Sequence, residues 1–245
     1  MHLTRESWTD ADAADTTLAV LPVGSTEQHG PHAPLGTDVL TAEAVAEAGA
    51  DRYADPVVVA PAIPVGIAEE HRRFSGTLWT SESTFRDYVR DVVGSLASHG
   101  WDRVVVVNGH GGNIAALKEV TARIVRHDDA YAVPFTWFDE VGEHTSDMGH
   151  AGPLETSLLR HTDAETVHED RLEAAAAEGA DRWGEWQGRV NLAVDSDEFT
   201  DNGVVGDPRE SSADLGEELL DRSADALCAL LDAVRNRDPG PRIDD

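Results

Sequence analysis

The chain has 245 residues, long enough to bury one large core, and we predict a single domain over residues 1–245. Its 47 acidic and 19 basic residues give a formal net charge of −28, which argues against nucleic-acid partners because phosphate repels such a surface. The acidic excess is typical of proteins that work in a high-salt cytoplasm, and 40% hydrophobic residues in regular patterns argue against a disordered chain.

Neither a disulfide nor a membrane segment is expected. Cys228 is the single cysteine, and it falls in an apolar helical run where a core position is the simpler interpretation. Residues 1–15 are polar and acidic, without the basic start and apolar centre of a signal peptide. No apolar run approaches the roughly 20 residues of a membrane-spanning helix. We therefore expect a cytoplasmic protein without a membrane partner.

Strand and helix patterns alternate along the chain, which predicts an α/β fold with a mostly parallel sheet. Residues 163–200 show no clear pattern, and the tail 236–245 is expected to be frayed. The predicted strands, in chain order, cover residues 17–24, 56–65, 103–107 and 131–138. The predicted helices cover 39–50, a segment capped by Ser81 or Ser83 that runs to about 96, 114–126, a short helix after 153, and 213–234.

The stretch 21–38 places acidic and imidazole side chains in a loop between a strand and a helix. Glu27 and His29 lie two residues apart, and Asp38 follows nine residues after His29. Imidazole nitrogens and carboxylate oxygens are metal ligands in enzymes, and loops at the carboxyl ends of strands carry the chemistry of α/β proteins. One alternative stays open: Glu27 and His29 are turn residues, and Asp38 caps the following helix.

A second loop, with the sequence NGHGGN at 108–113, follows a strand of four consecutive valines. His110 at this strand end can converge with the first loop on one edge of the sheet. Four ligands from two strand ends would make a floor for two divalent cations, with Asp38 able to bridge them. The G-x-G-x-x-G pattern of dinucleotide sites is absent.

A third stretch contains His150 and, five residues later, Glu155. Pro153 suits the first turn of a helix, which places Glu155 in that turn. Taken alone, Glu155 complements the helix dipole and His150 is a loop histidine, an interpretation that needs no site.

Together and in this order, these stretches resemble the signature of the creatininase (creatinine amidohydrolase) family, over about residues 15–235. The motifs are EQHGPH at 27–32 with Asp38 after it, EH at 70–71 with FSGT at 74–77, NGHGGN at 108–113, and HAGPLE at 150–155.

The resemblance implies a three-layer α/β/α sandwich, a homo-oligomer that is often a hexamer, and a two-metal centre that hydrolyses a cyclic amide or another small C–N bond. By position, the metal ligands are Glu27, His29, Asp38 and His110, with Asp38 in the bridging role. His150 matches a histidine that assists catalysis. His71 and His32 are reserves for that role or for substrate binding, although a solvated loop position is the favoured interpretation for residue 32.

One position departs from the family pattern. Creatininase itself has a glutamate two residues after the histidine that His110 matches, where this chain has Gly112. We expect that Glu155 completes the second metal site instead; the alternative is a weaker second site. The glycine also points away from creatinine as the substrate. An archaeal branch that the chain resembles is a deformylase of a formylamino-pyrimidine in riboflavin and deazaflavin synthesis, and with the acidic composition this indicates a halophilic archaeon as the source.

We therefore expect metal-assisted hydrolysis of a small-molecule amide, with Asp38 and a hydroxide bridging two Zn, Mn or Fe ions and His150 protonating the leaving nitrogen. Two alternatives are phosphoester hydrolysis, disfavoured because no arginine cluster lies near the motifs, and a non-catalytic metal-binding scaffold. Substrate specificity is expected in residues 135–150 and 180–205, which carry Trp137, Trp183 and Trp186.

Overall fold

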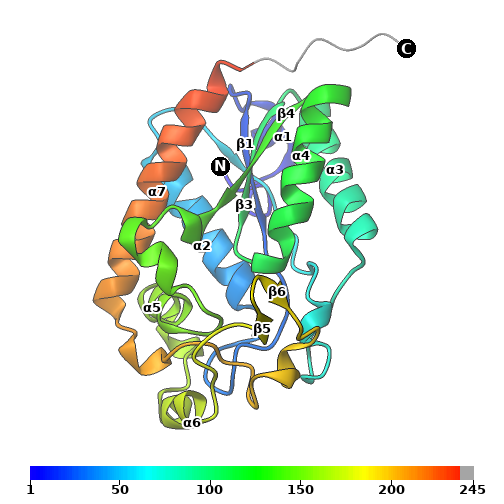
Figure 1. Cartoon of the computed structure of the whole chain (residues 1–245). Helices are drawn as coiled ribbons and strands as arrows, with labels where there is room; N and C mark the ends of the chain where they lie inside the picture. The colour runs from blue at the N-terminus through cyan, green and yellow to red at the C-terminus, as the bar shows by residue number, and fades with distance from the viewer. Residues whose placement is uncertain (238–245) are drawn as a thin grey trace.

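A four-stranded parallel sheet, with the strand order β2-β1-β3-β4, forms the centre of the computed structural model (Figure 1). The structure describes residues 1–237, and most of the tail expected to be frayed, residues 238–245, lies outside the described part. The strands are β1 (Leu18–Val23), β2 (Val58–Val59), β3 (Arg103–Asn108) and β4 (Tyr131–Thr136).

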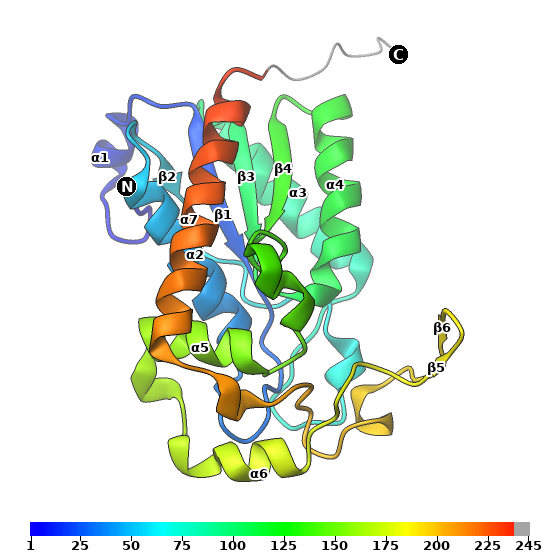
Figure 2. The same cartoon turned by 60° about the vertical axis from the view of Figure 1, so that its left-hand side comes forward.

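Helices cover both faces of this sheet, so the predicted three-layer α/β/α arrangement is confirmed (Figures 1 and 2). One layer contains α2 (Thr37–Arg52), α5 (Pro153–Thr162) and α7 (Ala213–Arg235), and the other contains α3 (Glu82–Ser98) and α4 (Ile114–His127). The four valines of β3 alternate between the two layers: Val105 and Val107 face α2 and α7, whereas Val104 and Val106 face α3 and α4. Each of these buried valines stabilises the fold by about 1.5–3 kcal/mol relative to an exposed one.

The first residues of three helices are stabilised by capping serines or by a proline that the sequence makes recognisable. The Ser81 hydroxyl accepts a hydrogen bond from the Thr84 amide at 3.3 Å and begins α3, as predicted. Ser212 does the same for α7 through the amide of Leu215 at 3.1 Å. Pro153 stands at the start of α5, where its missing N–H costs no helical hydrogen bond.

Two predicted strands are shorter in the structure. The apolar run at 56–65 forms only the two-residue β2, with one further bridge between Ile63 and Val23. Pro61 and Pro64 have no N–H to donate to a ladder, which limits this edge strand. The run at 131–138 leaves the sheet after Thr136, and its last residues belong to a 3-10 turn.

Residues 163–210 lie beyond the carboxyl ends of the strands and consist of short elements. A hairpin of β5 (Trp186–Gln187) and β6 (Val190–Asn191) projects from the body of the molecule (Figure 2). The other elements here are α6 (Leu172–Ala177) and the 3-10 turns η5 (Ala164–Thr166), η6 (Glu169–Arg171), η7 (Ser196–Glu198) and η8 (Pro208–Glu210).

The remaining elements are α1 (Trp8–Asp12), η1 (Glu69–His71), η2 (Gly111–Asn113), η3 (Trp137–Asp139) and η4 (Gly142–Asp147). Within residues 1–237, none of the helices has both the length and the hydropathy that crossing a membrane requires.

Candidate active site

The carboxyl ends of β1 and β3 bring the first three predicted ligands together. Glu27 follows β1 by four residues, Asp38 lies in the first turn of α2, and His110 follows β3 by two residues. Their exposed fractions are 0, 1 and 4%. His110 Nδ1 lies 3.1 Å from Glu27 Oε2 and 3.3 Å from Asp38 Oδ2. These three side chains therefore point at one small volume.

Asp38 also faces a second histidine. Its Oδ1 lies 3.1 Å from His29 Nε2, and the same nitrogen lies 3.6 Å from Glu155 Oε1. The other oxygen of Glu155 accepts a hydrogen bond from the Ala151 amide at 2.6 Å. Ala151 has a φ of 50°, a left-handed conformation that is uncommon without glycine. The two oxygens of Asp38 thus lie between two separate histidine–carboxylate pairs.

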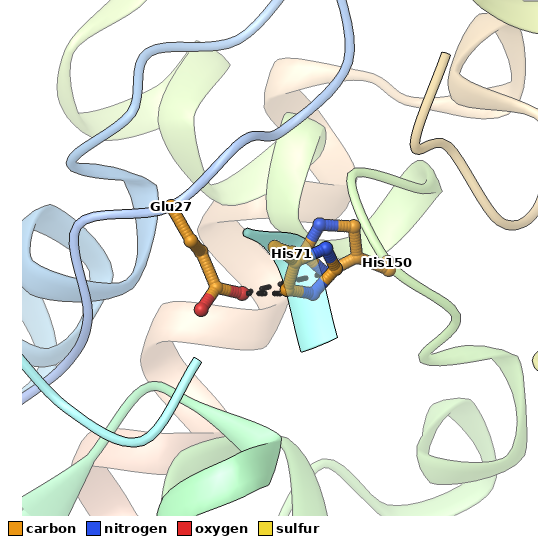
Figure 3. A group of neighbouring side chains, drawn as sticks. All are labelled: Glu27, His71 and His150. Carbon is orange, nitrogen blue, oxygen red and sulfur yellow. Dashed lines mark ion pairs between the residues drawn. The ribbon is translucent and has the colours of Figure 1, made fainter. Parts of the chain in front are cut away.

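His71 and His150 face Glu27 from the other side (Figure 3). Glu27 Oε1 lies 3.5 Å from His71 Nε2 and 3.7 Å from His150 Nδ1, and the two imidazole rings stack with centroids 4.5 Å apart. His150 Nε2 donates to the Gln28 carbonyl at 2.7 Å. This hydrogen bond leaves Nδ1 of His150 free to accept a proton.

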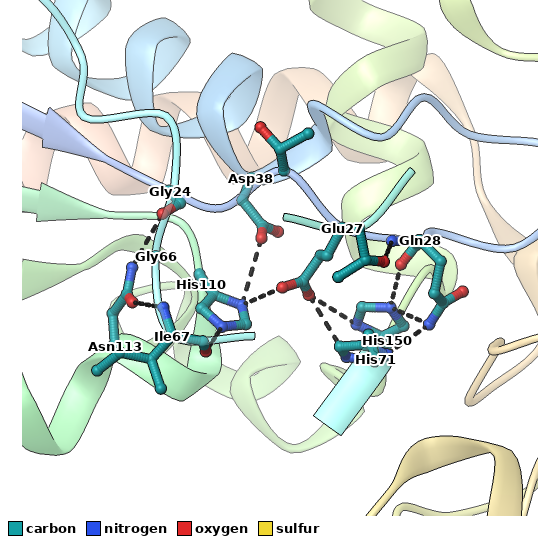
Figure 4. A network of polar contacts seen from close by, with 12 residues as sticks. Gly24, Glu27, Gln28, Asp38, Gly66, Ile67, His71, His110, Asn113 and His150 are labelled. Carbon is teal, nitrogen blue, oxygen red and sulfur yellow. Dashed lines mark hydrogen bonds and ion pairs between the residues drawn. The ribbon is translucent and has the colours of Figure 1, made fainter. Parts of the chain in front are cut away.

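Gln28 links the two histidines through its side chain, a role that the sequence analysis missed (Figure 4). Its Nε2 lies 2.8 Å from His71 Nδ1, 2.9 Å from His150 Nε2 and 3.2 Å from the Gly203 carbonyl. Its Oε1 accepts from the Gly30 amide at 2.9 Å. The available signal was its place between Glu27 and His29, inside the first motif.

The donor set fits divalent cations. Both carboxylate oxygens of Glu27, Asp38 Oδ2 and His29 Nε2 are buried without a hydrogen-bond partner. Buried carboxylates in that state are costly unless a cation or another charge compensates them. At this site, three sets of side chains each bring their ligand atoms within 4.8 Å of one another: Glu27–Asp38–His110, His29–His150–Glu155 and Glu27–His71–His150.

Burial and neighbouring charges shift the pKa values of these side chains in different directions. Burial raises the pKa of Glu27 to about 7. For His110, burial opposes the charge, but the carboxylates of Glu27 and Asp38 outweigh it and hold the pKa well above its usual value. Burial, reinforced by the other histidines, lowers the pKa of His71 to about 3 and that of His150 well below its usual value. His71 and His150 are therefore neutral bases in this environment.

The sequence as a whole matches a known protein family and several of its members. Residues 3–231 match the family model described as "Creatininase: Creatinine amidohydrolase". The chain belongs to the creatininase family. It is 35% identical to a mycofactocin precursor peptide peptidase of Mycolicibacterium smegmatis over 210 residues, which cover 83% of this chain and 79% of that protein. It is 29% identical to a creatinine amidohydrolase of Pseudomonas putida, over 70% of this chain and 74% of the relative.

The fold agrees with this assignment. A solved structure titled "Creatininase Mn" superimposes with a TM-score of 0.76 at 23% identity, covering 96% of this chain and 99% of the other. As a creatininase-family amidohydrolase, the chain is a hydrolase of C–N bonds.

All seven predicted site residues of this creatininase-family chain lie in one cluster; six line the cavity, and His29 lies beneath it against Asp38 and Glu155. The six are Glu27, Asp38, His71, His110, His150 and Glu155. His32 is different. It is fully buried rather than solvated, its Nε2 lies 3.0 Å from Thr156 Oγ1, and it does not line the cavity. The interpretation of a solvated His32 is therefore wrong, because the loop folds back onto α5 and encloses the ring.

Position 112 has no space for a side chain. A Cβ at this position would lie 2.3 Å from the Ile67 carbonyl oxygen and 2.5 Å from His110 Nε2. No larger side chain fits there without moving the loop that contains Ile67. Glu155 faces His29 from α5, on the opposite side of the site.

We call Glu27, His29, Asp38, His110 and Glu155 the floor of the site, and the cavity above them has a volume of about 810 Å³. Trp183 forms part of its wall, with its ring centroid 5.5 Å from that of His71 and 5.1 Å from that of Phe199. Arg182 is the single arginine among the lining residues, which include no lysine. Of the other expected specificity residues, Trp137 is fully buried in the core and Trp186 is 45% exposed on the hairpin.

Proposed function

We propose that the chain is a metal-dependent amidohydrolase in which Glu27, His29, Asp38, His110 and Glu155 would hold two divalent cations, with Asp38 shared between the two sites. The observation that carries the proposal is the position of the Asp38 carboxylate, with one oxygen 3.1 Å from His29 and the other 3.3 Å from His110. Glu27 completes one side and Glu155 the other. Nitrogen and oxygen donors without thiolate suit Zn, Mn or Fe.

Bound cations would acidify a water molecule and polarise the scissile carbonyl. The chain's own groups then handle protons. His150 Nδ1 is open to the cavity because Nε2–H is held by the Gln28 carbonyl, so His150 can take a proton from the attacking water and deliver it to the leaving nitrogen. His71 stacks on His150 and keeps its ring in place, and Trp183 shields both rings from solvent.

For the substrate we propose a small cyclic amide or a formamide, of which a formylamino-pyrimidine is one candidate. A bound substrate of this size would lie against the floor, with its carbonyl towards the cations that Asp38 and Glu27 would hold and its nitrogen towards His150.

A second candidate substrate is a peptide that presents a terminal amide bond. Two observations favour it: the cavity of about 810 Å³ accommodates ligands far larger than a single ring, and a relative of 35% identity is named a peptidase. Arg182 would face the peptide carboxylate across a wall that otherwise contains Asp181, Asp207 and Glu210.

We also propose that the protein is a homo-oligomer and works in a high-salt cytoplasm. The net charge of −28 supports the salt requirement. Exposed apolar side chains of the segment 186–194, namely Trp186, Val190, Leu192 and Val194, support an intersubunit contact. Light scattering in high salt tests the assembly.

The decisive experiment compares Asp38→Asn with Asp214→Asn. Asp214 also lies in the first turn of a helix, α7, but is exposed. We expect the purified wild type to contain about two metal ions per chain. Asp38→Asn should lose its bound metal, and its activity should fall by at least about 10³-fold, whereas Asp214→Asn should keep the metal content and the activity of the wild type. Full activity after chelation, or in the Asp38 variant, would overturn the proposal. Metal without activity on any amide would favour a non-catalytic scaffold.

The substrate class is tested with creatinine, N-formyl amines and short peptides on the same metal-loaded preparation. Arg182→Gln serves as the probe variant. We expect it to leave turnover of neutral small amides unchanged. If peptides are the substrates, it raises KM for those with a free carboxylate by about tenfold, the effect of losing one charge-assisted hydrogen bond.

A further inference from the structure

One backbone contact decides which nitrogen of His110 faces the carboxylates. His110 Nε2 donates to the Ile67 carbonyl oxygen at 2.6 Å, so the ring turns its Nδ1 towards Glu27 and Asp38. Ile67 belongs to the loop after β2, more than 40 residues away in sequence. Something must therefore hold this loop against the end of β3.

Asn113 makes that connection (Figure 4). Its side chain is fully buried, and its Oδ1 accepts a hydrogen bond from the Ile67 amide at 3.0 Å. Its Nδ2 donates to the Gly24 carbonyl at 3.1 Å and lies 3.3 Å from Asn108 Oδ1. One amide side chain thus joins the loop of Ile67, the end of β1 and the end of β3.

Asn108 holds the backbone of His110 in place. Its Oδ1 accepts from the His110 amide at 3.1 Å, and its Nδ2 donates to the His110 carbonyl at 2.8 Å. The backbone of His110 is therefore held by Asn108, while the far nitrogen of its ring is held through Ile67 by Asn113.

Two glycines make room for this arrangement. Without a side chain, Gly112 lets the Ile67 carbonyl approach His110 Nε2, since a Cβ there would lie 2.3 Å from that oxygen. Gly66 does the same for Asn113: a Cβ on Gly66 would lie 2.5 Å from Asn113 Oδ1 and 2.7 Å from the Gly24 carbonyl.

We propose that Asn113 and Gly112 are positioning residues that hold the Ile67 carbonyl against His110, and thereby keep Nδ1 of His110 directed at Glu27 and Asp38. Neither residue touches the reacting atoms. The consequence for metal binding rests on the proposed function, whereas the hydrogen bond itself does not. A histidine whose far N–H is held by a backbone carbonyl is oriented and made more basic as a ligand, and losing such support costs about 10–100-fold in metal affinity.

The first test uses metal-free protein with ¹⁵N-labelled histidine. The Nε2–H proton of His110, identified by its loss in His110→Gln, should exchange slowly with solvent in the wild type. In Asn113→Ala we expect its exchange to accelerate about tenfold, because the Ile67 amide loses the hydrogen bond that Asn113 accepts and the Ile67 carbonyl is no longer held against His110. Thr121→Ala is the matched control, since Thr121 is a buried polar residue of α4 whose hydroxyl donates only within its own helix. Unchanged exchange in Asn113→Ala would overturn the proposal.

The second test is a calorimetric titration with Zn²⁺ or Mn²⁺. We expect Asn113→Ala to weaken one of two binding events by about 10–100-fold and to leave the other within about threefold, because His110 supports one side of the Asp38 bridge. Equal weakening of both events, or of neither, contradicts a specific role for Asn113. If the wild type binds no metal, the proposed function fails, but the exchange experiment still tests the positioning.

Gly112→Ala is a second and independent variant, needed in case Asn113→Ala does not fold. The added methyl group should displace the Ile67 carbonyl and release the same His110 proton while Asn113 stays intact. If Gly112→Ala folds and keeps the slow exchange of the wild type, the proposal is wrong.

Discussion

The floor and the wall of the cavity are built in opposite ways. The floor residues Glu27, His29, Asp38, His110 and Glu155 are at most 4% exposed and come from the loops that follow β1 and β3 and from first turns of helices. The wall residues Asp181, Arg182 and Trp183 precede a hairpin of two strands of two residues each, and four apolar side chains of the segment 186–194 are between 45 and 75% exposed. Closely packed elements thus hold the reacting groups, while a segment with few buried side chains forms part of the cavity wall. Floor variants should change kcat, and wall variants should change KM.

Gln28→Leu should produce the largest effect of the variants that keep the ligands. Leucine has a similar size but cannot donate hydrogen bonds to His71 Nδ1 and the Gly203 carbonyl, as the Gln28 amide does. We expect kcat to fall by about 10–100-fold, as for other residues that orient a functional histidine, with KM changed less than about threefold. Steady-state kinetics on the metal-loaded enzyme measure both constants.

Gln187→Leu is the control for that substitution, because Gln187 is exposed on the hairpin. It should keep the kcat of the wild type. A Gln28 variant with normal kcat and raised KM would place Gln28 in the wall and remove the distinction between the two regions.

Trp183→Ala should have a smaller effect than Gln28→Leu, and it should change mainly KM rather than kcat. The indole packs edge-on against His71, His150 and Phe199, each contact being worth about 0.5–1.5 kcal/mol. We expect KM to rise by about 3–10-fold with kcat falling less. Trp186→Ala, the same change on a half-exposed side chain of the hairpin, should leave both constants unchanged. If kcat falls more than KM rises, Trp183 belongs to the catalytic floor.

The same contrast explains what the sequence could predict. Strands buried on both faces, such as β1 and β3, appear as unbroken apolar runs, and the polar residues after them must meet at one sheet edge. The seven site residues follow from this rule combined with the family motifs. The role of Gly112 does not, because the atom that requires it, the Ile67 carbonyl oxygen, comes from a different loop.

The structure of the segment that contains the wall could not be predicted for a related reason, although substrate-specificity residues were expected within 180–205. Residues 163–210 are placed by contacts that are distant in sequence, such as the bridge of His150 with Val205 and the hydrogen bond from Ser196 Oγ to the Glu70 carbonyl at 3.0 Å. No periodic pattern in the segment itself encodes these contacts. The length of β2 was predicted wrongly for another reason. The apolar residues at 56–65 suggested a longer strand, but Pro61 and Pro64 after β2 have no N–H to extend the hydrogen-bond ladder.

Salt should stabilise the protein through its surface more than through its floor. The net charge of −28 produces a self-repulsion that added salt screens, since the Debye length falls from about 10 Å at 0.1 M to about 3 Å at 1 M. We expect Tm to rise by several degrees over this range of KCl. The metal affinity of the buried floor should change less. A Tm that is independent of salt would contradict the high-salt assignment.

Asp128→Asn should have the smallest effect and lies outside both regions. Arg90 makes two hydrogen bonds to Asp128, at 2.6 and 2.5 Å, which join α3 to the end of α4. These bonds lower the pKa of Asp128 in the folded protein, so the stabilisation is present at neutral pH and is lost as the pH falls through the acidic range. Because the pair is largely solvated, we expect only about 0.5 kcal/mol in a double-mutant cycle with Arg90→Gln at pH 7. Urea unfolding should show this coupling shrinking below about pH 4, the usual pKa of aspartate.

A coupling that grows as the pH falls would mean that folding raises the pKa of Asp128 instead of lowering it. Site activity should not change in either variant, because neither residue lines the cavity above the floor.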